Sequence, residues 1–265
     1  MRQPCDTLLL KTVELSSGKR LLYPYLTYGY LSIKHSLQSL LLRPLFLTDC
    51  EKWRTRVVPD NTLQDVFDRK IWSEFQVYNG RPFLSEQLSF AFTIHVNLDW
   101  FRPFKHSNYS IGAIYMTIMN LPRNLRNKPE NILLVGILRG PSEPTNINGF
   151  LKPLVDELNE FWAGKELEIS GCSSKRNVRC ALLCASCDLP VGRKLCGFLS
   201  YNAHQGCSRC LKSFSGSPGE LDYSEFDRDN WLRCSRAEHE RIVIQLQSCK
   251  TKAAIADVET ESGYH

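Results

Sequence analysis

Residues 90–104 read FAFTIHVNLDWFRPF. From Phe90 to Leu98, apolar, β-branched and aromatic residues alternate in the pattern of a strand. Asp99 follows at once, ahead of an aromatic pair and a Pro-Phe. A carboxylate held at the tip of a buried strand is rigid and half-desolvated, as a hard cation such as Mg²⁺ requires of its protein ligands. This stretch therefore predicts a strand that presents a candidate metal ligand.

A second apolar, strand-like run, residues 177–187, leads to Asp188. Between the two runs the sequence predicts strands over residues 111–119 and 132–138 and an amphipathic helix over residues 147–162. Three strands, a helix and a fourth strand is the order of the ribonuclease-H-like core. We therefore expect an α/β fold with an incomplete ribonuclease-H-like core, in which Asp99 and Asp188 lie on adjacent strands and face each other. The alternative for each aspartate is a polar cap where a strand ends.

Several short motifs along the chain resemble those of the CACTA (En/Spm-type) DNA transposases. In order they are an Asp motif, a Tyr-Ser, an Asn-Leu-Pro, a strand ending in Gly-Pro, a helix start, an Asp-Leu-Pro and a Gly-Cys-x-x-Cys. In this sequence they are Asp99–Phe104, Tyr109-Ser110, Asn120–Pro122, Ile132–Pro141, Asn148–Leu158, Asp188–Pro190 and Gly206–Cys210. The resemblance extends from about residue 25 to the end of the chain and is densest between residues 92 and 214.

The resemblance implies metal-dependent DNA cleavage and strand transfer in cut-and-paste transposition, with transposon ends as the DNA partner. Two Mg²⁺ ions about 4 Å apart serve such chemistry; Asp99 would bridge both and Asp188 would hold one. The third ligand in the family is a glutamate far downstream, after an Asp-x-x-His element. The chain ends before either feature. Its late glutamates lack the family context and are expected to be solvated helix charges: Glu238, Glu240, Glu259 and Glu261.

From these features we expect a protein truncated before the C-terminal part of the core, with an incomplete and inactive site. Whether it is an enzyme stays open at this point. Two other classes stay open as well: a domesticated DNA-binding protein that does not cleave, and a protein-interaction module or genomic relic. Metal-dependent DNA cleavage would separate the transposase from both, and salt-dependent DNA affinity would separate the second from the third.

Cys207 and Cys210 form a Cys-x-x-Cys motif, in which Gly206 supports a tight turn. Two cysteines at this spacing bind one zinc ion as half of a tetrahedral site. The other half would come from the downstream Asp-x-x-His of the resembled family, or from His204, Cys196, Cys234 or His239. We expect a weak, partial Zn²⁺ site, because structural zinc gains its affinity from a closed ligand set. The alternatives are a redox dithiol or no ligand role, and an exposed loop position for His204.

Composition and charge are those of a folded protein with a basic body. The chain has 265 residues, is 43% hydrophobic and carries a formal net charge of +5. Residues 1–214 hold 27 Lys and Arg against 18 Asp and Glu, a surplus of 9, whereas residues 215–265 hold 6 against 10. This distribution is compatible with DNA contact because basic side chains neutralise phosphates, although an ordinary solvated surface explains it equally well.

The sequence indicates a location in the nucleus or cytoplasm. No apolar stretch approaches the roughly 20 residues that cross a bilayer, so no membrane contact is expected. Asp6 and Lys11 interrupt the only early apolar run, which argues against a signal peptide and secretion. The 11 cysteines are irregularly spaced, as in a reducing compartment. An oligomer is compatible with all of these features.

Three regions are predicted along the chain. Residues 1–88 form an accessory, mostly helical region with helix candidates at residues 36–42, 48–56 and 62–75. Residues 89–200 form the partial ribonuclease-H-like transposase core. Residues 201–265 hold the Cys-x-x-Cys insertion, an acidic linker and a terminal helix over residues 235–261.

Overall fold

In the computed structural model, the described residues are 10–24, 27–59, 62–78, 80–84, 89–144, 146–200, 203–205, 207, 209–217, 220–222, 224 and 232–264. The chain divides into two compact units. Residues 28–186 form one unit, and residues 1–27 together with 187–265 form the other. The first unit holds a large sheet with its helices and one two-stranded sheet, and the second holds the remaining helices and two two-stranded sheets.

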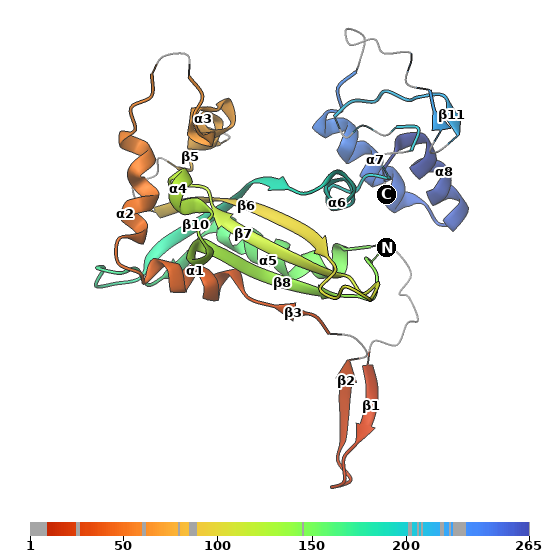
Figure 1. Cartoon of the computed structure of the whole chain (residues 1–265), viewed down its shortest axis with the longest axis horizontal. Helices are drawn as coiled ribbons and strands as arrows, with labels where there is room; N and C mark the ends of the chain where they lie inside the picture. Colours follow the sequence, from red (N-terminus) through yellow and green to blue (C-terminus); the bar gives the residue numbers. More distant parts are fainter. Residues whose placement is uncertain are drawn as a thin grey trace. The chain divides into compact units, whose positions relative to one another are not determined.

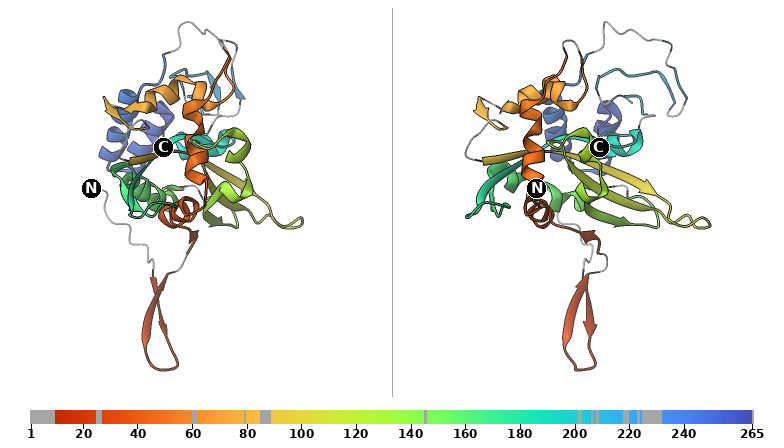
Figure 2. Two further views of the ribbon diagram at one scale, coloured as in Figure 1. Left: turned by 90° about the vertical axis from the view of Figure 1, so that its left-hand side faces the viewer. Right: turned by 60° about the vertical axis from the view of Figure 1, so that its left-hand side comes forward.

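The first unit is built on a twisted six-stranded sheet with the strand order β3-β8-β7-β6-β10-β9 (Figures 1 and 2). Its members are β3 (Gly29–Tyr30), β6 (Ser89–Phe101), β7 (Ile111–Ile118), β8 (Ile132–Arg139), β9 (Lys165–Leu167) and β10 (Arg176–Ser186). β6, β7 and β8 are antiparallel neighbours, whereas β10 runs parallel to β6. Helix α5 (Asn148–Ala163) lies between β8 and β10 in the chain. The strands and the helix predicted for this part of the sequence are all present.

Helices cover one face of the sheet. α5 packs against β10 and against α1 (Ile33–Leu41), and Phe46 of α2 (Phe46–Glu51) contacts the ring of Phe92 (Figure 1). The β6 side chains that alternate onto the covered face are almost completely buried: Phe92, Ile94, Val96 and Leu98. These side chains stand at every second position, as the period of a strand requires.

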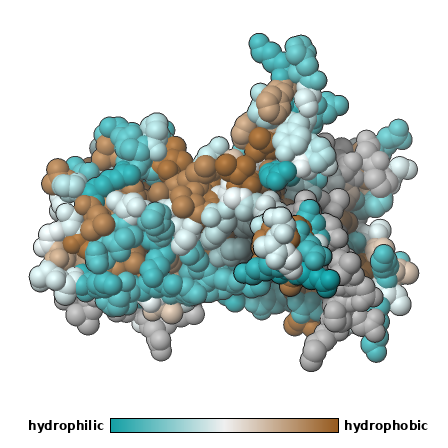
Figure 3. Space-filling view, turned by 90° about the horizontal axis from the view of Figure 1, so that it is seen from below, coloured by the Kyte–Doolittle hydropathy of each residue, from teal (hydrophilic) through white to brown (hydrophobic). Residues whose placement is uncertain are grey.

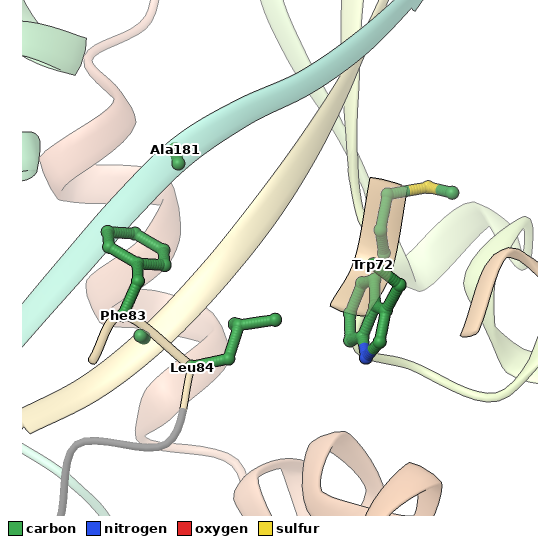
Figure 4. Close-up of a cluster of buried hydrophobic side chains, with 6 residues drawn as sticks. Trp72, Phe83, Leu84 and Ala181 are labelled. Carbon is green, nitrogen blue, oxygen red and sulfur yellow. The ribbon is translucent and has the colours of Figure 1, made fainter. Parts of the chain in front are cut away.

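The opposite face of the sheet is only partly covered. At one end a cluster of side chains from α3 (Lys70–Gln76) and from the segment after β4 (Val77–Tyr78) and β5 (Arg81–Pro82) packs against β6 and β10. Figure 4 shows Phe83 directed toward Ala181 of β10. Further along this face, Leu134 and Ile137 of β8 stay exposed. Other apolar side chains are exposed elsewhere, and hydrophobic patches interrupt the hydrophilic surface in Figure 3.

Asn120, from the predicted Asn-Leu-Pro motif, anchors the first half of β6. It is 1% exposed. Its Oδ1 accepts hydrogen bonds from the backbone N–H of Thr93 at 2.8 Å and from the Thr93 hydroxyl at 3.2 Å. Its Nδ2 donates to the carbonyl of Ala91 at 3.2 Å. This landmark of the family motif is therefore a structural residue, because it satisfies buried polar groups of the central strand.

Glu157, the glutamate of the predicted helix-start motif, ties α5 to the beginning of α1. Its carboxylate accepts hydrogen bonds from the Tyr30 hydroxyl at 2.9 Å, the Ser32 hydroxyl at 2.5 Å and the backbone N–H of Ile33 at 2.5 Å. An acceptor at this place satisfies a free N–H of the first helical turn. Burial and this carboxylate raise the pKa of Tyr30.

Residues before β6 differ from the helices that the sequence predicts. The candidate at residues 48–56 is α2 followed by a 3₁₀ helix, η1 (Lys52–Thr55), and the candidate at residues 62–75 begins only at η2 (Val66–Asp68) and continues as α3. Asp65 sets the later start because its carboxylate accepts from the N–H of Val66 at 2.6 Å, while Asp68 accepts from the N–H of Asp65 at 2.8 Å. Strands β1 to β5 also lie in this part, so it is mixed rather than mostly helical.

The second unit contains the remaining elements. They are β1 (Leu10–Glu14), β2 (Arg20–Pro24), α6 (Leu189–Leu195), β11 (Gly216–Ser217), β12 (Glu220–Leu221), α7 (Arg236–Ser248) and α8 (Lys252–Ser262). The predicted terminal helix is thus two helices. Thr251 caps the second one, because its hydroxyl accepts from the N–H of Ala254 at 3.2 Å. The two helices pack through Ile242, Leu246 and Val258.

Candidate active site

Asp99 lies on β6, two residues before the end of the strand. Ladder hydrogen bonding places it opposite Ala113 of β7. Its neighbour Leu98 is buried on the helix-covered face, whereas Asp99 is exposed on the other face. One carboxylate oxygen accepts from the backbone N–H of Trp100 at 2.9 Å. The ladder with β7 therefore holds the backbone of Asp99, while its carboxylate meets solvent.

The ring of Trp100 packs across the sheet over Gly112. A methyl group at Gly112 would lie 2.8 to 2.9 Å from three carbons of the ring, so a larger residue fits here only if the ring moves. This contact agrees with the packing role that adjacent aromatics usually have, rather than with an exposed stacking surface for DNA. Trp100 thereby helps to hold the part of β6 that carries Asp99.

The end of β10 is fixed to β6 by backbone register and by one side chain. Ser186, the last residue of β10, pairs with Asn97 in the parallel ladder. Asn97 Nδ2 also donates to the carbonyl of Ser186 at 2.6 Å. Asn97 belongs to no motif in the sequence, although its place two residues before Asp99 puts it on the same face of the strand. The prediction that the two strands before the aspartates are adjacent is confirmed.

Asp188 lies two residues beyond the end of β10, not at the tip of the strand. It is the N-cap of α6, where its Oδ1 accepts from the N–H of Val191 at 2.8 Å. Asp188 is exposed, and its other carboxylate oxygen accepts no hydrogen bond from the part of the chain that the structure describes. The capping hydrogen bond is sufficient to explain an aspartate at this position. It leaves the second carboxylate oxygen of Asp188 available to a ligand.

Cys207 and Cys210 lie in the second unit, where the N–H of Arg209 donates to Cys207 Sγ at 3.4 Å. Gly206 lies outside the described residues. Burial raises the pKa of the Cys207 thiol, but hydrogen bonds from the N–H of Arg209 and from Cys210 outweigh it and lower the pKa overall. Burial is the main cause of a raised pKa at Cys210. The more acidic thiol is the better metal ligand, because metals bind the thiolate.

Three of the four side chains proposed for the other half of a zinc site, His204, Cys234 and His239, have contacts of their own. His204 Nδ1 lies 3.0 Å from the carbonyl oxygen of Phe214, and Cys234 Sγ lies 2.6 Å from the Tyr264 hydroxyl. His239 packs against the ring of Tyr264. Among the described residues, no three His, Cys, Asp or Glu side chains gather closely enough to hold a metal ion. The expected candidates therefore do not assemble a closed set with Cys207 and Cys210.

The late glutamates lie on α7 and α8. Glu238 pairs with Arg241 at 2.7 Å and Glu240 pairs with Arg236 at 2.8 Å, both on the surface of α7. Ion pairs at these spacings are ordinary features of an exposed helix.

None of the helices in the described ranges is long and apolar enough to cross a membrane.

A comparison with protein families places the chain among the transposases. It belongs to the transposase family tnp2, whose model matches residues 60–219, more than half of the chain. The matched range contains both aspartates, the Asn-Leu-Pro motif and the Cys-x-x-Cys. The chain is therefore a transposase-derived protein, and DNA is the partner that this family implies in general. No curated protein matches the chain.

Proposed function

We propose that the chain carries a ribonuclease-H-like transposase core of the CACTA (En/Spm) type, with metal-dependent DNA cleavage and strand transfer as its parent activity. Three antiparallel strands, a helix and a fourth strand beside the first support this assignment. DNA ends of a transposable element are the substrate, and the nucleus is the compartment in which such a substrate is found. Family membership supports the broader part of the proposal.

The register between β6 and β10 is the observation that carries the proposal. Asn97 and Ser186 are paired, and each aspartate follows its paired residue by two positions. Parallel strands run in the same direction, so their chains leave the sheet at the same edge. We therefore propose that Asp99 and Asp188 act together as ligands of Mg²⁺.

Each aspartate has a defined part in this proposal. Asp99 offers an exposed carboxylate on a rigid strand, and Asp188 offers the oxygen that does not cap α6. Mg²⁺, when bound, supplies activation of the attacking hydroxyl and stabilisation of the leaving oxygen. Two carboxylates fit a hard cation but leave most of its coordination to water and DNA.

Residues 1–265 by themselves are proposed to bind metal weakly and not to cut or join DNA. Glu238 and Glu240, two of the carboxylates considered as third ligands, are held in ion pairs on α7. Loss of one positioned group from such a site typically costs about 10² to 10³ in rate. The alternative is a domesticated protein that binds DNA without cleaving it. The surplus of basic residues in residues 1–214 favours this alternative.

The test is metal binding followed by electron paramagnetic resonance of Mn²⁺. The wild-type chain is expected to bind Mn²⁺, and Asp99→Asn and Asp188→Asn are each expected to abolish the bound signal. Asp156→Asn is the matched control, because Asp156 is an exposed carboxylate of α5 paired only with Lys152 in the described chain. Equal binding by all four proteins would refute the site.

A plasmid assay separates the catalytic proposals. Supercoiled DNA incubated with the chain and Mn²⁺ is expected to remain intact. Nicking that disappears in Asp99→Ala would contradict the proposed inactivity and establish a complete nuclease.

For Cys207 and Cys210 we propose a partial zinc site, and equal zinc content in the wild type and a Cys207→Ser/Cys210→Ser variant would rule it out.

A further inference from the structure

A hollow of about 810 Å³ lies in the first unit, beside η1, η2 and α4 (Arg123–Arg126). Ligand pockets in proteins typically occupy about 300 to 1,000 Å³. Its lining includes two aromatic, three basic and one acidic side chain: Trp53, Phe67, Lys52, Arg56, Arg123 and Asp65. Its size and lining suit a ligand that combines an aromatic ring with an anionic group.

The aromatic part of the hollow is held rigidly. The rings of Trp53 and Phe67 lie 6.2 Å apart at an angle of 31°. Trp72 packs edge-on against both, at 5.1 Å and 4.6 Å. Trp72 belongs to the buried cluster that covers one end of the sheet (Figure 4), so the two lining rings rest on a fixed support.

The charges of the hollow leave a positive surplus. Arg56 is paired with Asp68 at 2.6 Å and 3.1 Å, and the lining carboxylate of Asp65 is paired with Arg126 at 2.9 Å. Those charges offset each other. Arg123 is exposed and forms no ion pair with any described residue, and Lys52 has only an exposed pair with Asp49, which contributes little.

The hollow is distinct from the candidate active site. α4 begins shortly after Ile118, the last residue of β7, which pairs with Ile94 on β6. Ile94 precedes Asp99 by five positions, or roughly 17 Å along a strand. A ligand in the hollow would therefore lie at the opposite end of the sheet from Asp99.

We propose that this hollow binds an unpaired nucleotide of single-stranded DNA. The base stacks on the face of Trp53 opposite the Arg54 guanidinium, which lies 4.5 Å from the ring centroid, and the phosphate is bound by Arg123 and Lys52. Phe67, which lies under the guanidiniums of Arg56 and Arg126, supports the Trp53 ring. Bases of single strands stack on aromatic side chains without sequence preference, whereas the bases of a duplex have no free face. This inference rests on the proposed function only in taking DNA as the partner, because the site needs neither Asp99 nor a metal ion.

The experiment measures fluorescence anisotropy of a labelled oligothymidylate in EDTA, with duplex DNA and thymidine monophosphate as competitors. Arg123→Ala is expected to weaken oligothymidylate binding and to lower the slope of the salt dependence by about 0.7. Trp53→Leu is expected to weaken binding about 5- to 100-fold. Lys34→Ala, which removes an exposed lysine of α1, is the control and should bind as the wild type does.

Three results would overturn the proposal. The first is that Arg123→Ala binds oligothymidylate as tightly as Lys34→Ala does. The second is that Arg123→Ala loses as much affinity for duplex DNA as for the single strand. The third is that thymidine monophosphate competes as well as the unlabelled oligonucleotide. Circular dichroism checks that Trp53→Leu is folded, and Arg123→Ala decides the result if it is not. Because metal is absent, failure here leaves the Mn²⁺ test of Asp99 untouched, and the reverse also holds.

Discussion

Replacing Asn120 by alanine tests the anchor of the central strand. The change removes the partner of the Thr93 N–H, the Thr93 hydroxyl and the Ala91 carbonyl, all in a buried position. A buried polar group left without a partner costs about 1 to 3 kcal/mol, and the hydroxyl can rotate to another acceptor. Two backbone groups therefore remain, and we expect Asn120→Ala to lower the free energy of unfolding by about 2 to 4 kcal/mol.

The assay is urea denaturation followed by far-ultraviolet circular dichroism. Asn159→Ala is the matched control, because Asn159 is exposed on α5 and its loss should change the free energy of unfolding by less than about 0.5 kcal/mol. A loss below about 1 kcal/mol for Asn120→Ala, with an unchanged denaturant slope, would refute the account of this anchor.

Three further changes test other parts of the fold. Gly112→Ala should destabilise the protein by about 1 to 3 kcal/mol, because the new methyl group meets the Trp100 ring, whereas Gly149→Ala should be tolerated since no atom lies within 4 Å; equal thermal midpoints would contradict this. Glu157→Gln should lower the thermal midpoint, because the amide keeps only part of the three hydrogen bonds that Tyr30, Ser32 and Ile33 donate, and no change would refute the proposed tie between α1 and α5. The Arg56 guanidinium holds the pKa of Asp68 down to about 2. The ionised Asp68 therefore stabilises the fold above the pKa of an unfolded carboxyl, and this stabilisation is lost as pH falls from about 4 toward 2. Melting curves recorded at several pH values should show that Asp68→Asn lacks this part of the acid dependence.

The sheet could be predicted because its strands carry their own signals. The structure has β6 over the stretch Phe90 to Leu98, in which residues 91–94 are buried on both faces and residues 94–98 alternate between buried and half-buried positions. The run before Asp188 was also predicted as a strand, and it is β10. Such periodicity is a local property, so it can be read from one sequence.

The remaining differences come from interactions that periodicity does not report. The helix predicted from Thr62 starts late because Asp65 and Asp68 cap a short 3₁₀ turn. The terminal helix breaks where Thr251 begins a second one. Asp188 was expected at a strand tip, but its hydrogen bond to Val191 makes it a helix cap, which a carboxylate two residues after a strand satisfies equally well.

The structural roles of Asn120 and Glu157 could not be predicted from the sequence, for a different reason. Both stand in motifs shared with a transposase family, which draws attention to function. In the structure, Asn120 bonds to buried backbone groups of β6, among them the N–H of Thr93, 27 residues earlier in the chain. Glu157 accepts from the N–H of Ile33 at the start of α1, 124 residues earlier. A single sequence does not show which distant groups a polar side chain meets.

The convergence of Asp99 and Asp188 on one cation is the central claim, and iron-directed cleavage tests it most directly. Fe²⁺ takes the place of Mg²⁺, and the radicals it generates with ascorbate and peroxide cut the polypeptide beside the bound ion. We predict cuts beside both aspartates in the same chain, and we predict that Asp99→Asn removes both while Asp156→Asn removes neither. A cut beside Asp188 that persists in Asp99→Asn would contradict the shared site.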